Sequence, residues 1–545
     1  MTPRLAIRAA LRLSLLACAT LLLVSCADAP RAQAPGAEPV DLLIRGGRIV
    51  DGSGNAWVRG DVAIQGGRIV AVGPLEGMTA RRVIDAKDHI VAPGFIDTHA
   101  HLEGNLFDRP TADNFVQDGV TTLITGNCGG SDEQGVKAFF DHVARTGVSV
   151  NVATLVGHNT VRKQVMGLSN RPATPEEQRR MEALVDQAMN EGAVGLSTGL
   201  IYLPGLFSNT SEVVGLAKVA ARHHGLYASH IRDEGSKVVE AINEALDVGR
   251  QAKLPVQISH FKVSAPANWG RSKETLALVD QARAEGLDVT IDQYPYTASS
   301  TTLSVVLPDW AVEGGQSAIR QRLGDPATRA RIAEEILQSA RRNKRPSYAY
   351  AVVARSASEP ALNGRSISEI NLQRSRPATL EAEIQTLLDI VQAGGAQMTF
   401  HGMSEEDVRR IMAWPFAMIG ADGSVQNGVG MPHPRSYGTN ARVLGKYVRE
   451  EHVMPLEEAI RRMTSLAAQR FQLADRGLLR PGYAADIVVF DDKTVHDRAT
   501  FEDPQQMSAG FDAVIVNGVI TVQNGQHSGA RAGEGLKGPD AKPAK

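Results

Sequence analysis

Apolar stretches that alternate with helical patterns constrain the fold of this chain more than any other feature. In one clear unit, a capping box at Thr174-Pro-Glu-Glu177 begins a predicted helix, Gly192 ends it, and the apolar stretch 193–197 follows. Strands that alternate with amphipathic helices form a parallel sheet. The predicted strands are the one ending at His99, then 121–125, 150–155, 193–197, 226–231, 256–261, 288–294 and 416–420. Eight such units predict an α/β fold of the (β/α)8 TIM-barrel type.

The segments outside these units predict further parts of the molecule. The gap between the seventh and eighth strands, about 300–400, is too long for a loop and predicts an inserted subdomain. Short alternating strands broken by Gly-Gly turns predict a small β-sandwich built from 38–92 and 480–525, with the barrel at 93–479. Residues 526–545 are rich in Gly, Lys and Pro, which predicts a disordered tail.

The N-terminus carries an export pattern. Three arginines precede a short apolar run, which predicts a signal peptide over residues 1–25 rather than a stable membrane span. Leu23-Val-Ser-Cys26 resembles the bacterial lipobox, whose cysteine receives lipid, so we expect a lipid-anchored linker at 26–37. The resemblance implies an exported bacterial lipoprotein on the periplasmic side. Ala27, rather than Asp, favours the outer membrane.

Composition excludes two classes of protein. The formal net charge of -2 over 545 residues leaves no basic surplus to neutralise phosphates, so we expect no nucleic-acid partner. A disulfide-stapled fold is also excluded, because Cys18 leaves with the signal peptide and Cys26 would carry lipid. Cys128 is then the single free thiol of the mature chain.

Side chains that bind metals follow several of the predicted strands. Active sites of (β/α)8 barrels lie at the carboxyl ends of the strands. His99 and His101 share one face of an extended strand, because residues i and i+2 point the same way. The other candidates at strand ends are Cys128, His230, His260 and Asp422. Four imidazoles, a thiol and a carboxylate at one edge predict a metal centre.

We expect the metal to be Zn(II), because magnesium and calcium take more oxygen ligands. Six candidate ligands exceed one tetrahedral site, and two arrangements remain open. In one, two metals are bridged by Cys128. In the other, Cys128, His230 and His260 hold one tight zinc, and His99 and His101 form a weaker second site.

Five motifs together resemble the D-aminoacylase family of the amidohydrolase superfamily. They are Gly94-Phe-Ile-Asp-Thr-His-Ala-His101, Gly126-Asn-Cys-Gly-Gly130, Ser229-His-Ile-Arg-Asp-Glu234, Ile258-Ser-His-Phe-Lys262 and Gly420-Ala-Asp-Gly423. The Gly-Asn-Cys-Gly motif is specific, because most relatives bridge their metals with a carbamylated lysine on the fourth strand, and 193–200 has none. The resemblance implies zinc-dependent hydrolysis of N-acyl-D-amino acids to a carboxylate and a free D-amino acid.

Metal-assisted amide hydrolysis assigns a role to Asp422. We expect it to accept the proton of the attacking water as general base and to return it, as general acid, to the leaving amine.

The substrate carboxylate needs a cation, for which the candidates are Lys262, on the same face as His260, and Arg435. The resemblance adds Tyr202, Tyr294 and Ser300 as substrate contacts, and the register leaves Tyr296 and Ser299 open. His158 and Arg162 also match the family, and we interpret both as structural. His401 lies in the inserted region, and no role is assigned to it.

Three other functions remain open. An L-Xaa-D-Xaa dipeptidase acting on periplasmic or cell-wall peptides would need a pocket for a free α-amine. A cyclic-amide hydrolase is less favoured, because Cys128 stands in place of the carbamylated lysine. A non-catalytic metal-binding lipoprotein is disfavoured by the intact Asp422.

Overall fold

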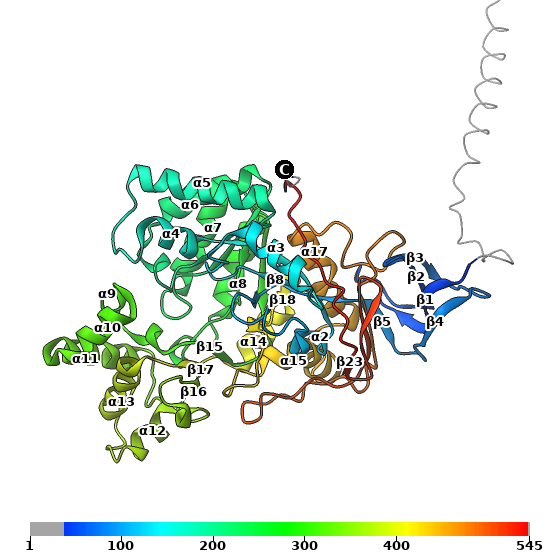
Figure 1. Cartoon of the computed structure of the whole chain (residues 1–545). Coiled ribbons are helices and arrows are strands. Elements are labelled where there is room, and N and C mark those ends of the chain that lie inside the picture. Colours follow the sequence, from blue (N-terminus) through cyan, green and yellow to red (C-terminus); the bar gives the residue numbers. More distant parts are fainter. Residues whose placement is uncertain (1–37, 543–545) are drawn as a thin grey trace, which may run out of the picture.

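The computed structural model describes residues 38–542 and consists of a barrel, a small β-domain and an insertion (Figure 1). The expected signal peptide (1–25), the linker (26–37) and Cys26 lie outside the described residues. Within 38–542, no helix combines the length and apolar character needed to cross a bilayer.

The barrel strands follow the predicted order and pair in parallel. They are β6 (Phe95–Asp97), β8 (Val120–Thr125), β9 (Asn151–Thr154) continued by β10 (Val156–Gly157), β11 (Gly195–Gly199), β12 (Leu226–His230), β13 (Val256–Ile258), β14 (Val289–Gln293) and β18 (Ala417–Ile419). The backbone amide of Thr98 donates to the carbonyl of Ile419 at 3.4 Å, which closes the last strand on the first. Two short strands, β7 (Ala100–His101) and β19 (Gly423–Ser424), extend this closure.

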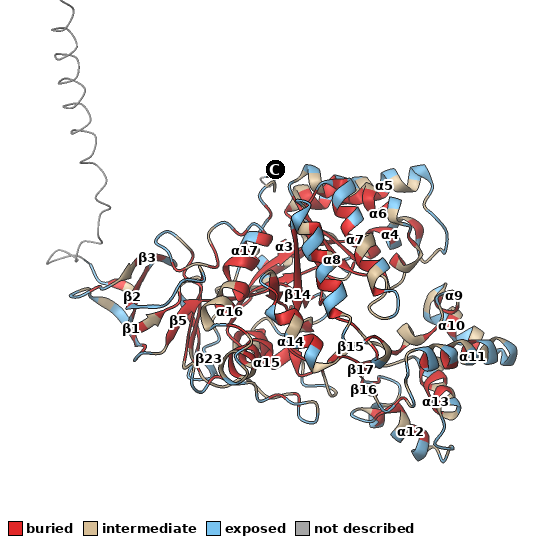
Figure 2. Ribbon diagram, turned by 180° about the vertical axis from the view of Figure 1, so that it is seen from behind, coloured by how far each residue is buried: buried red, intermediate tan, exposed pale blue. Residues whose placement is uncertain are grey.

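Helices surround the strands and bury one side against them (Figure 2). They are α2 (Asp113–Val116), α3 (Val136–Thr146), α4 (His158–Met166), α5 (Pro175–Glu191), α6 (Thr210–Arg222), α7 (Val238–Ala252), α8 (Ser272–Ala284), α14 (Glu405–Ala413), α15 (Arg435–Arg442), the π-helical Val443–Glu450, α16 (Leu456–Met463) and α17 (Ser465–Arg470). The capping box of α5 forms as predicted, with Thr174 and Glu177 each bonded to the other's backbone amide.

The small domain draws strands from both ends of the chain, as predicted, but its strands belong to one continuous nine-stranded sheet. They are β1 (Val40–Ile49), β2 (Val58–Gln65), β3 (Arg68–Gly73), β4 (Ala80–Asp85), β5 (Ile90–Pro93), β20 (Ile487–Phe490), β21 (Phe511–Val516), β22 (Val519–Gln523) and β23 (Gln526–His527). Side chains from the two ends share one apolar cluster, including Ile44, Ile64, Ile487 and Ile515. The two halves therefore pack as one unit.

The insertion lies between β14 and β18, away from the small domain (Figure 1). It contains β15 (Ala298–Thr302), α9 (Asp309–Val312), α10 (Gly315–Gly324), α11 (Pro326–Arg342), β16 (Ala351–Arg355), α12 (Ile367–Gln373), α13 (Leu380–Ala393) and β17 (Gln397–His401). Its strands form an antiparallel three-stranded sheet. Buried apolar residues drawn from positions 303–400 form a separate core in the insertion.

The prediction of a disordered tail at 526–545 is wrong for the described part. After β23 the chain runs along the barrel, where the amide of Val152 donates to Glu534 O at 2.9 Å and the amide of Gly538 to Gly192 O at 2.9 Å. Glycine makes this approach feasible, because a Cβ on Gly533 would lie 2.1 Å from Val150 O. Several of the glycines that suggested disorder, including Gly533, Gly535 and Gly538, allow close packing on the barrel.

Candidate metal centre

The structure brings the six predicted ligands together at the carboxyl ends of the barrel strands. His99 follows β6, His101 lies in β7, Cys128 follows β8, His230 ends β12, His260 follows β13 and Asp422 follows β18. The sulfur of Cys128 lies at the middle of the group, 3.3 Å from His99 Nε2 and 3.5 Å from both His230 Nδ1 and His260 Nε2.

Asp422 lies on the other side of His99. Its Oδ1 is 3.0 Å from His101 Nε2 and 3.6 Å from His99 Nε2, and its Oδ2 is 2.9 Å from Arg435 Nη1. Burial alone would raise the pKa of Asp422, but Arg435, His99 and the hydrogen bond from His101 outweigh it and hold the pKa well below its usual value. The carboxyl group is therefore ionised at neutral pH.

Three of these ligands have left-handed backbones. The φ angle is 52° at Cys128, 33° at His260 and 51° at Asp422. Non-glycine residues rarely adopt this conformation, which costs on the order of 1–3 kcal/mol and gathers at functional sites. The surrounding fold holds them there. For example, a Cβ on Gly199 would lie 2.1 Å from Cys128 O, so only glycine leaves room for the Cys128 loop.

The donor set fits a metal. The sulfur of Cys128 lies 3.3–3.5 Å from three ring nitrogens. A thiol and neutral imidazoles have too few protons for hydrogen bonds to join all four atoms. Burial and the Asp422 charge raise the pKa of the Cys128 thiol, so a cation is needed to hold it as a thiolate. Three groups of donors lie close enough together to hold a single ion: His99, Cys128 and His260; His99, His101 and Asp422; and His230, Glu234 and His260. One ring nitrogen binds one ion, so His99 Nε2, 3.3 Å from Cys128 Sγ and 3.6 Å from Asp422 Oδ1, could serve only one of the first two groups. The donor set therefore fits one metal, or two if His99 binds only one of them.

Three buried carboxylates at the site were missed by the sequence reasoning. Asp292 Oδ1 lies 3.3 Å from His99 Nδ1 and accepts the amide of His260 at 2.7 Å. Asp97 accepts the amides of His99 and Ala421, and burial raises its pKa to about 8. Glu234 contacts His260. Asp97 and Asp292 lie at strand ends, so the rule that found the histidines could have found these two.

The two predicted carboxylate-binding cations flank one ring. Lys262 Nζ lies 5.6 Å from the centre of the Tyr294 ring and the Arg435 guanidinium 4.6 Å from it. Both cations already have acidic partners, because Lys262 donates to Glu234 at 2.5 Å and Arg435 pairs with Asp422. The structure thus places them beside the metal group, and their contact with substrate stays a prediction.

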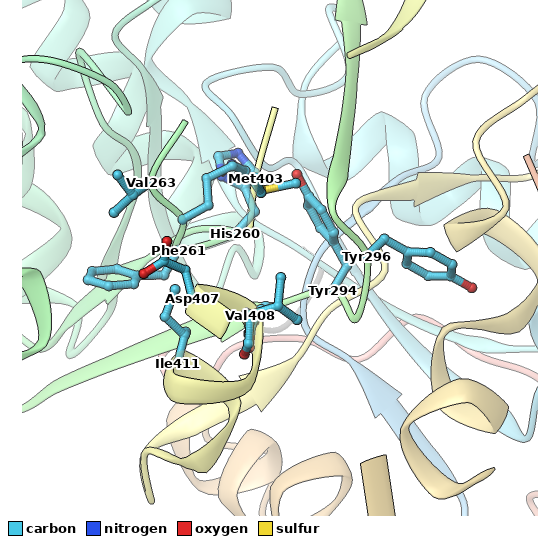
Figure 3. Close-up of a pocket in the computed structure, with 11 residues that line it drawn as sticks. His260, Phe261, Val263, Tyr294, Tyr296, Met403, Asp407, Val408 and Ile411 are labelled. Carbon is cyan, nitrogen blue, oxygen red and sulfur yellow. Dashed lines mark hydrogen bonds between the residues drawn. The ribbon is translucent and has the colours of Figure 1, made fainter. Parts of the chain in front are cut away.

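Tyr294 and Tyr296 point in opposite directions. A small cavity beside His260 and Lys262 is bordered by the Tyr294 ring and Met403, and the Tyr296 ring points away from it (Figure 3). Tyr296 instead packs on His433, with ring centres 5.2 Å apart. Both tyrosines belong to the lining of the cavity, but the Tyr294 ring is the one beside Lys262, and the contact of either with substrate stays a prediction.

Tyr202 and Ser300 border the same region. The Tyr202 ring lies 4.8 Å from that of His230, and its hydroxyl bonds to Thr301 at 3.0 Å. Arg435 donates to the backbone carbonyl of Ser300 at 3.3 Å. Ser299 precedes Ser300 in β15 and faces the other side of the strand.

The remaining family-like residues lie in the core or in the insertion. His158 and Arg162, on α4, both pair with Glu212 of α6. All three side chains are buried, which agrees with the structural interpretation. His401 ends β17, and its ring packs on Phe501 at 4.6 Å.

Comparison with known sequences defines the class: residues 82–522 match the amidohydrolase family model, and the chain belongs to that family. Among its relatives, the D-aminoacylase of Alcaligenes xylosoxydans xylosoxydans is 37% identical over 92% of this chain and 98% of its own length. The N-acyl-D-glutamate deacylase of the same organism is 38% identical over 88% of this chain and 93% of its own length.

A solved structure agrees with these sequences. The N-acyl-D-glutamate deacylase from Bordetella bronchiseptica, in complex with zinc and a phosphonate inhibitor that mimics the tetrahedral intermediate, superposes with a TM-score of 0.79 at 35% identity. The match covers 92% of this chain and 100% of that one. The predicted barrel fold and family are thereby confirmed.

Proposed function

We propose that this protein is a zinc-dependent deacylase that cleaves the amide bond of N-acyl-D-amino acids. One observation carries the proposal: Cys128 Sγ lies within 3.3–3.5 Å of three imidazole nitrogens, beside an ionised Asp422. The names of the relatives support the substrate class, because they act on D-aminoacyl compounds and on N-acyl-D-glutamate. Zinc bound to the deacylase of similar fold supports the choice of metal.

Different residues of the site would bind the metal and transfer the proton. Cys128, His230 and His260, whose donor atoms lie 2.8–3.5 Å apart, would hold one zinc, and His99, His101 and Asp422 lie where a second, weaker ion would be held. Bound zinc polarises a scissile carbonyl and lowers the pKa of water towards about 7. Asp422 accepts the proton of the attacking water and delivers it to the departing amine.

Positive charge beside Tyr294 supports recognition of the substrate carboxylate. Arg435 and Lys262 lie on that side of the site, and Tyr202, Tyr294 and Ser300 border it. The free carboxylate of a substrate, next to the scissile amide, would pair with Arg435 or Lys262 in place of Asp422 or Glu234.

A substrate screen tests the proposal. Purified protein is assayed for released amine with N-acetyl-D-amino acids, their L-enantiomers, L-Xaa-D-Xaa dipeptides and a cyclic amide, and its zinc is counted. We expect turnover of the N-acetyl-D-amino acids and at least one zinc per chain. Turnover of dipeptides alone would establish the dipeptidase, and zinc without any turnover would establish a binding protein.

We also propose that the chain is exported and held at the periplasmic face of the outer membrane by lipid on Cys26. The basic and apolar N-terminus and the Leu23-Val-Ser-Cys26 sequence support this. The full-length chain should sediment with outer membranes and take up a labelled fatty acid. The Cys26→Ser variant should do neither, and an unlabelled full-length chain would contradict the proposal.

A further inference from the structure

Glu234 is a buried carboxylate behind two of the metal-binding imidazoles. It lies in the loop between β12 and α7, four residues after His230. One oxygen, Oε1, makes all its contacts at the site: it is 3.0 Å from His260 Nδ1, 3.8 Å from His230 Nε2 and 2.5 Å from Lys262 Nζ. The side chain is 15% exposed.

The two rings present their other nitrogens to the metal group. His260 Nε2 and His230 Nδ1 lie 2.8 Å apart and both face Cys128. The outer nitrogens, His260 Nδ1 and His230 Nε2, are therefore the ones on the Glu234 side. A histidine that binds a metal through one nitrogen carries its proton on the other and needs an acceptor for it. Glu234 Oε1, 3.0 Å from His260 Nδ1, is the acceptor within reach of that nitrogen, whereas its distance of 3.8 Å from His230 Nε2 is too long for a hydrogen bond.

Glu234 also neutralises a buried cation. Lys262 Nζ lies 2.7 Å from His260 Nδ1, and the lysine is 6% exposed. Without Glu234, this ammonium would be an unpaired charge next to the imidazoles that must receive a metal cation. A buried unpaired charge is costly, and its field opposes the binding of a second positive charge nearby.

We propose that Glu234 is a positioning residue that sets the metal affinity of Cys128, His230 and His260. It orients His260 through its outer nitrogen and cancels the charge of Lys262. The inference rests on the metal dependence in the proposed function but not on the identity of the substrate.

Metal binding, measured separately from activity, tests the inference. Zinc affinity is determined by competition with a chelator for the wild type, Glu234→Gln and Glu234→Ala, and Co(II) loading is followed through its thiolate absorption. Outer partners of metal ligands typically contribute about 10–100-fold in affinity. We expect Glu234→Gln to bind zinc about 10–100-fold more weakly, Glu234→Ala more weakly still, and turnover of Glu234→Gln to recover as zinc is raised.

Glu244→Gln is the matched control. Glu244, on α7, is 14% exposed and pairs at 2.9 Å with Arg232 of the loop that carries Glu234, so its loss removes a similar ion pair away from the histidines. Its zinc affinity should stay within about twofold of wild type, since Glu244 pairs with Arg232 and Thr210 and not with a metal-binding histidine. Wild-type affinity in Glu234→Gln would overturn the inference, as would an equal loss in Glu244→Gln.

A double variant covers the case in which Glu234→Gln folds poorly. Lys262→Met combined with Glu234→Ala removes both charges and the acceptor oxygen, so weaker zinc binding in that variant reports on the orientation of His260. Wild-type affinity in the double variant would overturn the orienting role. If the wild type binds zinc but cleaves no N-acyl-D-amino acid, the proposed function fails while this measurement still stands.

Discussion

At the residue scale, the metal centre depends on backbone conformations as much as on side-chain type. Cys128, His260 and Asp422 all have positive φ angles and converge from three different strand ends. Such positions persist only where the neighbouring structure fixes them. The site is therefore preorganised by the barrel, and its side chains need little rearrangement to bind a metal.

Asp422→Asn tests the proton-transfer role at this scale. The amide keeps the shape of the side chain but cannot accept the proton of water, so we expect kcat to fall by about 10²–10⁴-fold. Zinc on Cys128, His230 and His260 should be retained, because none of these depends on Asp422 for a bond to the metal. Turnover of an N-acetyl-D-amino acid and zinc content are the measurements. Near-normal turnover would show that another group moves the proton.

The sequence predicted the site residues that lie at the ends of barrel strands. The strand-end rule located four histidines, Cys128 and Asp422 because residue type and strand boundary coincide there. The same rule predicted that Lys262 binds the substrate but missed its ion pair with Glu234. Glu234 lies 28 residues away, and the contact depends on how the two loops fold. Long-range pairing of this kind is absent from local patterns.

At the scale of elements, a buried ion pair joins two neighbouring helices. Arg162 of α4 bonds to Glu212 of α6 and to the carbonyl of Arg171 at 2.8 Å, and His158 Nε2 lies 2.8 Å from Glu212. Arg162 and His158 are fully buried. This contact fixes the position of α4, whose first turn lies beside the Cys128 loop: the amide of Thr160 donates to Gly129 O at 3.1 Å.

Glu212→Gln should destabilise the protein by roughly 3–5 kcal/mol, because it leaves the Arg162 charge buried and unpaired. Burial would raise the pKa of Glu212, but His158 and Arg162 outweigh it and lower the pKa. The stabilisation is thus present above the unfolded pKa of about 4.3 and is lost as the pH falls through the lower folded value.

Thermal unfolding between pH 3 and pH 7 measures both effects. We expect the variant to unfold at a lower temperature at pH 7 and to lose less stability on acidification than the wild type. Glu133→Gln is the control. It removes the exposed ion pair between Glu133 and Lys163 of α4, and the unfolding temperature should change little. Parallel pH profiles for wild type and Glu212→Gln would contradict the assignment.

The C-terminal segment acts as a brace between the small domain and the barrel. Asn517 donates to Ala532 O at 2.7 Å, Glu534 pairs with Arg476 at 2.6 Å, and the amide of Leu536 donates to Val152 O at 2.8 Å. Deleting residues 528–545 leaves the buried Val152 amide without its acceptor, which costs about 1–3 kcal/mol. We expect a lower unfolding temperature with unchanged zinc content. Deleting only 543–545 is the control, and equal unfolding temperatures for both deletions would exclude the brace.

At the scale of the whole molecule, the insertion and the barrel have separate apolar cores. Leu387 belongs to the insertion cluster and Leu123 to the barrel cluster, and both are fully buried. Units with separate cores open with different free energies. The insertion core can therefore lose stability separately from the barrel strands.

Leu387→Ala should weaken the insertion by about 2–5 kcal/mol. Hydrogen exchange, read by mass spectrometry, should accelerate over residues 303–400 and stay unchanged in the barrel strands, with zinc content unaffected. Leu123→Ala should show the reverse distribution. Faster exchange throughout the chain in Leu387→Ala would show that the two cores unfold as one.

The architecture was predictable because strand and helix periods repeat through the barrel, and the insertion appeared as a break in that repeat. Two features of the fold could not be predicted from the sequence. The glycines between 529 and 538 look like flexible linker residues, but some of them allow close backbone approach to the barrel. The β-strands of the two chain ends form one sheet because β5 pairs with β20, a contact between residues some four hundred positions apart.

The closure between Thr98 and Ile419 has a consequence for biosynthesis. The ribosome makes the thiol and all four imidazoles well before residues 417–424. Until those residues emerge, the first strand lacks its neighbour on one side. The centre gains its acidic member last, so a polypeptide interrupted before residue 417 would lack the carboxylate assigned to proton transfer.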